Sequence, residues 1–166
     1  MQQYLVPYFN PPKLAAANGL YALAGVNLQV STNLTDWTVI TRDLGVMFQL
    51  RYGGSAFLGP LSFGPIAFST DGQVWELTSP LSGKYFQSVG FANGRYGAFT
   101  TASSDGTQPA VSAATVDLTN WQTATLPDAF TNSLGMVSAG DTFFLLNTVS
   151  NGFFSSKDAL NWQQPT

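Results

Sequence analysis

The chain has 166 residues, of which 45% are hydrophobic and 9% are charged, and its formal net charge is −3. An average soluble domain carries about 25% charged residues, so Ser, Thr, Asn, Gln and Gly must form most of this polar surface. Six Lys and Arg residues provide no basic patch for nucleic acid or anionic lipid. The absence of Cys and His excludes disulfides, thiolate metal sites and the commonest general base, and we expect neither a metal ion nor a cofactor.

The first segment in chain order, residues 1–12, precedes a series of repeats. It lacks the basic and apolar regions of a secretory signal, and no stretch of the chain approaches the ~18 apolar residues of a membrane span. Tyr4, Tyr8 and Phe9 make this segment too apolar for a solvated tail. We expect an N-terminal arm that pairs with the last repeat or contacts a neighbouring subunit or partner.

Four copies of a short unit follow, and each contains one of the four tryptophans. The local pattern is [Ser/Thr]-x-[Asp/Asn]-x-x-x-Trp, and consecutive tryptophans are 38, 46 and 41 residues apart. A short apolar run precedes each pattern and an alternating run follows it, which predicts a turn between two antiparallel strands. The twelve pattern residues are Ser31, Asn33, Trp37, Ser69, Asp71, Trp75, Thr115, Asp117, Trp121, Ser156, Asp158 and Trp162.

A second, tight hairpin is predicted upstream of each turn, because pairs that tolerate positive φ separate alternating runs there. These pairs are Asn18-Gly19, Gly53-Gly54, Asn93-Gly94 and Gly140-Asp141. Two hairpins make a four-stranded antiparallel unit, and a period of about 40 residues is typical of a β-propeller blade. We therefore predict an all-β propeller of four blades, over about residues 13–45, 46–84, 85–130 and 131–166.

The four blades can be arranged in two ways. A ring closed within one chain is favoured, because the blades are small. The alternative is an open arc that completes a larger ring only as a homo-oligomer, because the terminal faces of a repeat array need a cover. The longest spacing is explained by an insertion at Thr101–Pro109, between the second and third strands of the third blade.

The turn pattern resembles the Asp-box, the repeat of sialidase-type (BNR) β-propellers, in a form one residue shorter than the usual S-x-D-x-G-x-x-W. The resemblance extends from about Pro12 to Thr166 and implies a folding role, in which Asp and Ser bond the turn backbone and the aromatic residue packs between blades. Simple chemistry agrees, since an Asp or Asn side chain locks an Asx-turn and a Trp buries up to roughly 250 Å². One carboxylate per turn is too few for calcium, and Asn33 carries none.

A glycosidase-like enzyme is the third-ranked hypothesis for the function of this chain. Sialidases share the repeat, and their chemistry needs an arginine cluster, a Tyr–Glu nucleophile pair and an Asp acid. This chain has Arg42, Arg51 and Arg95, and its single Glu, Glu76, directly follows a pattern Trp. A glycosidase needs two carboxylates roughly 5–10 Å apart, whereas the acids here mostly sit in turns. We predict no glycosidase or other enzymatic activity.

The remaining candidates are binding functions. Chains with short Asp-boxes and few charges resemble bacteriophage tail, fibre and capsid-decoration proteins. That resemblance implies a virion component, assembled in the host cytoplasm, that acts through contacts with other virion proteins. The alternative is a propeller lectin or host-receptor-binding module that takes a glycan through aromatic and amide side chains. Function must lie where the repeats differ, so besides the arm we expect partner contacts at Ser104, Asp105 and Gln108 of the insertion.

Overall fold

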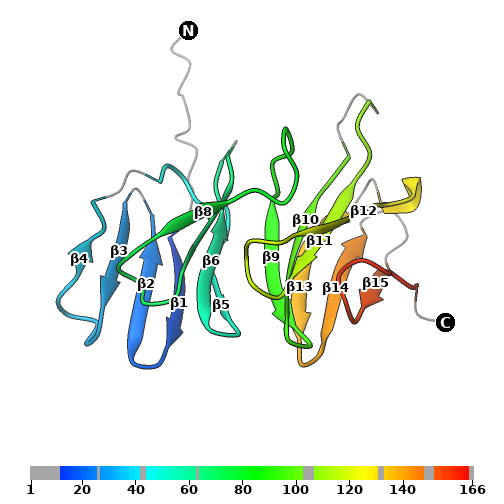
Figure 1. The fold of residues 1–166 in the computed structure, drawn as a ribbon. Helices are drawn as coiled ribbons and strands as arrows, with labels where there is room; N and C mark the ends of the chain where they lie inside the picture. Colours follow the sequence, from blue (N-terminus) through cyan, green and yellow to red (C-terminus); the bar gives the residue numbers. More distant parts are fainter. Residues whose placement is uncertain are drawn as a thin grey trace, which may run out of the picture.

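The computed structural model describes residues 12–25, 27–41, 44–62, 64–102, 107–130, 133–147 and 152–164. These residues form four antiparallel sheets, in which the strands follow the order of the chain (Figure 1). The first sheet contains β1 (Lys13–Ala17), β2 (Leu20–Ala24), β3 (Leu28–Ser31) and β4 (Thr38–Val39). The second contains β5 (Arg51–Gly53), β6 (Ala56–Pro60), β7 (Ile66–Ser69) and β8 (Glu76–Thr78).

The third sheet contains β9 (Ser88–Ala92), β10 (Arg95–Thr100), β11 (Val111–Thr115) and β12 (Gln122–Thr125). A short 3₁₀ helix, η1 (Asp128–Phe130), leads to the fourth sheet, which contains β13 (Ser133–Ala139), β14 (Thr142–Asn147) and β15 (Phe153–Ser156). The fourth strand predicted for this last unit is reduced to one bridge between Ser155 and Gln163.

The sheets are built from the hairpins that the sequence predicts, except that the tight turn of the second sheet is Gly54-Ser55 and not Gly53-Gly54, since Gly53 belongs to β5 and pairs with Ala56. The β1–β2 and β9–β10 turns hold Asn-Gly pairs at positive φ, a conformation whose twist matches that of the flanking strands. The turns that contain the tryptophan pattern join the third strand of each unit to the chain that follows it. All these turns lie at one end of the sheets, and the longer connections lie at the opposite end (Figure 1).

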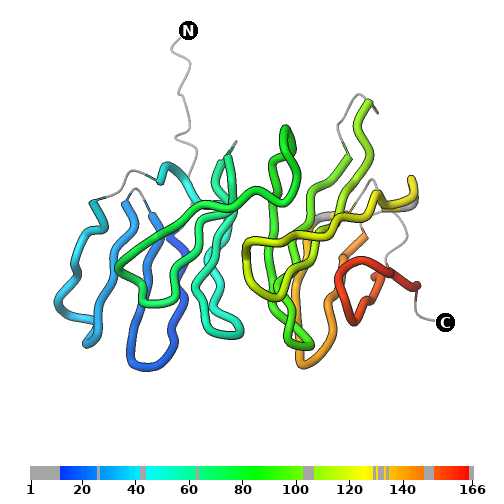
Figure 2. Tube along the Cα trace, viewed as in Figure 1, coloured from blue at the N-terminus to red at the C-terminus, as the bar shows by residue number. Residues whose placement is uncertain are grey.

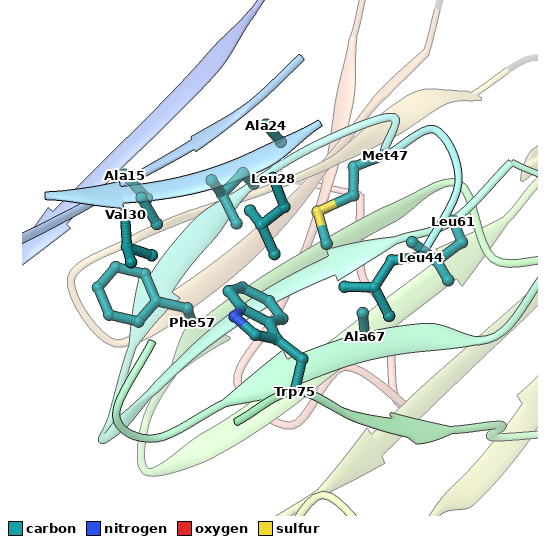
Figure 3. Close-up of a cluster of buried hydrophobic side chains, with 12 residues drawn as sticks. Ala15, Ala24, Leu28, Val30, Leu44, Met47, Phe57, Leu61, Ala67 and Trp75 are labelled. Atoms are coloured by element: carbon teal, nitrogen blue, oxygen red, sulfur yellow. The ribbon is translucent and has the colours of Figure 1, made fainter. Parts of the chain in front are cut away.

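The core is divided into three buried clusters, each between two consecutive sheets. In the first cluster, Leu28 and Val30 of the first sheet meet Phe57 and Trp75 of the second (Figure 3). The second cluster joins the second sheet to the third, and the last joins the third sheet to the fourth. Each apolar seam therefore holds one pair of neighbouring sheets together, as in a stack of propeller blades.

The sheets form an open arc in the described part of the chain. None of the three clusters joins the fourth sheet to the first, and Figure 2 shows the chain running from the first sheet, in blue, to the fourth, in orange and red, on the other side. Strands β6, β7 and β11 of the middle sheets are buried on both faces, whereas β14 alternates between buried and more exposed residues. The favoured ring closed within one chain is thus not formed by the described residues, because each end sheet lacks a neighbour on one side.

Candidate functional site

The four turns that contain the tryptophan pattern, here called the Trp turns, are residues 31–37, 69–75, 115–121 and 156–162. In the second Trp turn, Asp71 Oδ1 accepts hydrogen bonds from the backbone N–H groups of Gln73 and Val74, both at 2.8 Å. Ser69 Oγ accepts another from the Gly72 N–H, at 2.8 Å. In the first Trp turn the Asn33 side-chain oxygen accepts the two equivalent backbone bonds. The side chains of each turn therefore satisfy backbone donors that would otherwise have no strand partner.

The tryptophan of each turn folds back on the turn and, in the later units, reaches the preceding sheet. The Trp75 indole N–H donates to the Gly72 carbonyl at 2.9 Å. The Trp121 indole donates to Thr78 Oγ1 of β8, at 2.8 Å, as well as to its own turn. The Trp162 indole reaches Ser112 Oγ of β11 in the same way, at 3.2 Å. These contacts connect neighbouring sheets.

Three carboxylates of the Trp turns, those of Asp71, Asp117 and Asp158, are held in their ionised form. Backbone hydrogen bonds from Val74 and Gln73 lower the pKa of Asp71, and bonds from the backbone and side chain of Asn120 lower the pKa of Asp117 strongly. Partial burial opposes the effect at Asp158, but bonds from Asn161 and other groups still lower its pKa to about 2. Since these carboxylates are already bonded to the turns, they are poorly placed to donate or accept a proton in catalysis.

A groove opens at the opposite end of the sheets, where the connections lie; we call it the connection groove. Its volume is about 320 Å³, and it lies among three connections: the one before β5, the one from β8 to β9, and the inserted one from β10 to β11. The residues that line it are Phe48, Gly83, Lys84, Tyr85, Gln87, Thr100, Thr101, Ala102 and Gln108. Both rings among them, Phe48 and Tyr85, are exposed.

Hydrogen bonds hold the walls of the connection groove together. Lys84 Nζ donates to the carbonyl of Pro109, at 3.1 Å, and so ties the β8–β9 connection to the insertion. Thr101 Oγ1 donates to Gln87 Oε1 at 3.3 Å, across the same boundary. Lys84 is the one charged residue among those that line the groove. The described residues that line the groove thus offer aromatic faces, amides and hydroxyls, and no carboxylate.

Six residues are predicted from the sequence to contact a partner, and one of them lies at the groove. Gln108 is exposed and lines it. The others, namely Tyr4, Tyr8, Phe9, Ser104 and Asp105, lie outside the described residues. Sequence reasoning missed Phe48 and Tyr85, because they lie in connections that do not repeat from unit to unit. The available signal was that both are aromatic residues outside any alternating strand.

The residues weighed for an enzyme are not brought together at the groove. Glu76 is exposed on β8, Arg51 is exposed on β5, and Arg95 begins β10 just after a hairpin turn. Arg42 lies outside the described residues. In the described part of the chain, no group of three or more His, Cys, Asp or Glu residues could hold a metal ion.

A second, smaller hollow of about 240 Å³ lies against the fourth Trp turn. It is lined by Thr142, Ser155, Ser156, Lys157, Asp158, Asn161 and Gln163. Its charged groups are already engaged, since Lys157 Nζ lies 2.6 Å from Asp141 Oδ1 in a solvent-exposed ion pair and Asp158 holds the turn. This hollow is therefore a weaker candidate than the connection groove.

Comparison with known proteins shows the fold and no more. No protein-family model matches the chain, and no curated protein matches it. The solved structure of YCF48 bound to a D1 peptide is 13% identical and superposes with a TM-score of 0.62, over 91% of this chain and 50% of that chain. The computationally designed Ika4 protein is 11% identical, with a TM-score of 0.63, over 97% of this chain and 100% of that one.

A chain of an S. cerevisiae complex of dbp5 with nup159, gle1, IP6 and ADP is 11% identical, with a TM-score of 0.59, over 92% of this chain and 46% of that chain. This protein therefore spans about half the length of the YCF48 chain and of the yeast chain. The all-β propeller fold predicted from the sequence is confirmed. Among the described residues, no helix has the length and hydropathy needed to cross a bilayer.

Proposed function

We propose that this protein is a binding module without chemistry of its own, and that a protein partner docks in the connection groove. The observation that carries the proposal is the position of Phe48 and Tyr85, two exposed aromatic side chains that come from different connections and line one groove. Aromatic rings provide much contact area with few rotatable bonds, and they are enriched where proteins meet. The fixed walls around them also reduce the entropy lost on binding.

The groove suits a largely uncharged partner segment. Among the described residues that line it, Lys84 alone is charged and already donates to the Pro109 carbonyl, and the other polar groups are amides and hydroxyls. These groups suit hydrogen bonds to the backbone of a peptide better than ion pairs. The YCF48 structure that superposes on this chain is described as bound to a D1 peptide, which supports the use of such a fold for peptide binding.

We further propose that the partner belongs to a virus particle, in which this chain is a tail, fibre or capsid-decoration component. The support is the low share of charge together with the resemblance of the short turn pattern to phage structural proteins. Mass spectrometry of purified particles tests this proposal, because a structural component is present in a fixed ratio to the capsid protein. Its absence from such particles would contradict the virion assignment and leave the groove proposal standing.

A glycan is the second candidate ligand, because the same groove combines aromatic rings with amide groups. Rings of this kind stack on the apolar faces of sugars, and amides bond to hydroxyl groups. This alternative assigns the protein to lectins or host-receptor-binding modules.

One experiment separates the two ligands. Fluorescently labelled protein is applied to an immobilised peptide library and to a glycan array, in parallel with Tyr85→Ala and Phe48→Ala. We expect peptide binding that falls at least tenfold in both variants, since each removes an exposed anchor from the groove. Val74→Ala is the matched control, because Val74 is exposed in a Trp turn at the other end of the sheets. Glycan binding with the same dependence would favour the lectin, and binding unaffected by either substitution would refute this groove as the site.

A further inference from the structure

We infer that two copies of this chain join end to end in one ring, with the fourth sheet of each copy packed on the first sheet of the other. This inference is independent of the proposed function, since it rests on the two end sheets and not on the connection groove. The face of the first sheet that points away from the second is called the leading face. The face of the fourth sheet that points away from the third is called the trailing face.

The leading face carries apolar side chains that are exposed in the described part of the chain. Leu14 pairs with Leu23 in the first sheet, at the place that Val89 and Met136 occupy in the third and fourth sheets. Val89 and Met136 are each 1% exposed, because the preceding sheet covers them, whereas Leu14 is 56% exposed. Ala15, one residue on, packs toward the second sheet, so the alternation along β1 turns Leu14 away from it.

The Trp turn of the first sheet shows the same difference. Leu34 and Leu118 follow the pattern Asn or Asp of their turns, and both have a positive φ, of 65° and 63°. Leu118 is 4% exposed because it packs into the cluster between the second and third sheets. Leu34 is 50% exposed, since the described residues form no sheet before its own. In a single copy, the apolar side chain of Leu34 is therefore exposed although its backbone adopts a strained conformation.

The trailing face has the complementary property. Leu146 and Phe153 are cross-strand partners in the fourth sheet, as Pro60 and Ile66 are in the second. Pro60 and Ile66 are buried, whereas Leu146 and Phe153 are 45% and 42% exposed. Phe144 lies beside Phe153, with ring centroids 5.6 Å apart, and extends the apolar surface. The corresponding pair of the third sheet, Phe99 and Ser112, is also fully buried, so both middle sheets have this position covered by the next sheet.

A second copy is the occupant that fits both faces. Contact between the trailing face of one copy and the leading face of another repeats the three sheet-to-sheet contacts already present within the chain. No charged residue lies among the interface residues named on either face, so packing these residues together buries no unpaired charge. The contact joins two different surfaces, and such head-to-tail contacts give a closed ring when the rotation between copies closes.

The extent of the arc, compared with two longer chains, favours a ring of two copies. The described residues form no core between the chain's own first and fourth sheets. The arc superposes over at least nine tenths of its length on about half of two longer chains with propeller-type folds. Two arcs of this extent together match the extent of those longer chains.

Multi-angle light scattering after size exclusion tests the inference over a concentration series. We expect a mass of about twice the 17.7 kDa of a single chain. Leu14→Lys alters only the leading face and Leu146→Glu only the trailing face, and each should return the mass to that of one chain. Val74→Lys and Val74→Glu are matched controls, because Val74 is 65% exposed in the second Trp turn, away from both faces, and both controls should remain dimeric.

Mixing the two variants gives the sharper test. In a head-to-tail pair of Leu14→Lys with Leu146→Glu, one of the two contacts has neither substitution, so the mixture should regain dimers that each variant alone lacks. A single-chain mass for the unaltered protein at every concentration would overturn the inference, whichever segment then covers the end faces. A larger assembly would refute the ring of two. A mass sensitive to only one of the two substitutions, or a mixture that stays monomeric, would exclude the head-to-tail contact.

Discussion

Replacement of Trp75 by Ala tests the role of the Trp turns in joining sheets. Trp75 is 2% exposed in the cluster between the first and second sheets, and its indole N–H bonds the Gly72 carbonyl. Removing a buried Trp leaves a cavity that the neighbouring sheets cannot fill, which costs about 3–5 kcal/mol of unfolding free energy. For a chain of this size, that loss corresponds to a fall in Tm of roughly 6–20 °C. Urea denaturation and differential scanning calorimetry measure both quantities.

Trp37→Ala is the matched control, because it makes the same change at the same position of the first Trp turn. Trp37 belongs to none of the three described clusters, and the hydrogen bond of its indole goes to its own turn, at Leu34. Both variants are measured in the Leu14→Lys background, so that association of copies does not contribute. We expect Trp37→Ala to cost clearly less than Trp75→Ala. Equal costs, or a change below about 1 kcal/mol for Trp75→Ala, would refute the assignment of Trp75 to the seam between sheets.

Two further predictions concern the interior of the sheets and the acid stability of the turns. Gly59→Ala places a Cβ against the Gln49 backbone carbonyl, so we expect it to lower the unfolding free energy by roughly 1–3 kcal/mol in urea denaturation. Gly25→Ala is the control and should be neutral, because its Cβ enters open space. Equal stability of the two variants would contradict this prediction. The pKa of Asp158 is lowered to about 2 in the folded chain, below its ordinary value of 3.8, so its contribution to stability is present above pH 4 and is lost as the pH falls toward 2. Asp158→Asn should therefore reduce the loss of stability between pH 4 and pH 2. The turn should be kept, because Asn33 makes the equivalent backbone bonds in the first unit. An unchanged profile of stability against pH would show that the Asp158 carboxylate is not responsible for the acid loss of stability.

The repeating part of the fold could be predicted from the sequence because its chemistry is local. A hydroxyl residue, an Asp or Asn and a Trp within seven residues specify a turn that bonds its own backbone, and Gly- or Asn-containing pairs specify the other hairpins. The positive φ at Leu34, Leu118 and Ala159 was not predictable in this way, because those residues rarely adopt it. At Leu118 and Ala159 the conformation is compensated by burial of the side chain in the cluster shared with the preceding sheet, which is a tertiary effect.

The connection groove was only partly predictable for the opposite reason. Gln108 was named because the insertion in the third unit interrupts the repeat. Phe48 and Tyr85 come from connections between units, where neither spacing nor alternation constrains the chain. Their meeting in one groove depends on how the second and third sheets pack, and this packing is set by long-range contacts such as the hydrogen bond from the Val89 N–H to Gln49 Oε1.

Whether the ring closes within one chain could not be read from the repeat at all. All four units carry apolar residues at the interface positions, so the pattern at Leu14 resembles the pattern at Val89 although one is exposed and the other is buried. Burial is decided by the rotation between neighbouring sheets, which accumulates over the arc and has no local signal in the sequence. The small size of the blades favoured closure, but the described sheets keep their end faces apart.

The two inferred surfaces are compatible because they lie on different parts of each blade. The contacts between copies involve the leading and trailing faces of the first and fourth sheets, whereas the connection groove opens at the ends of the strands. If the contact between copies repeats the contacts within the chain, every blade of the ring points the same way, and both grooves open on one side of it. Both grooves of one ring could then bind at once to an assembly that carries many copies of the partner. The second binding event would be intramolecular, so the ring would hold a repetitive surface more tightly than a single groove could.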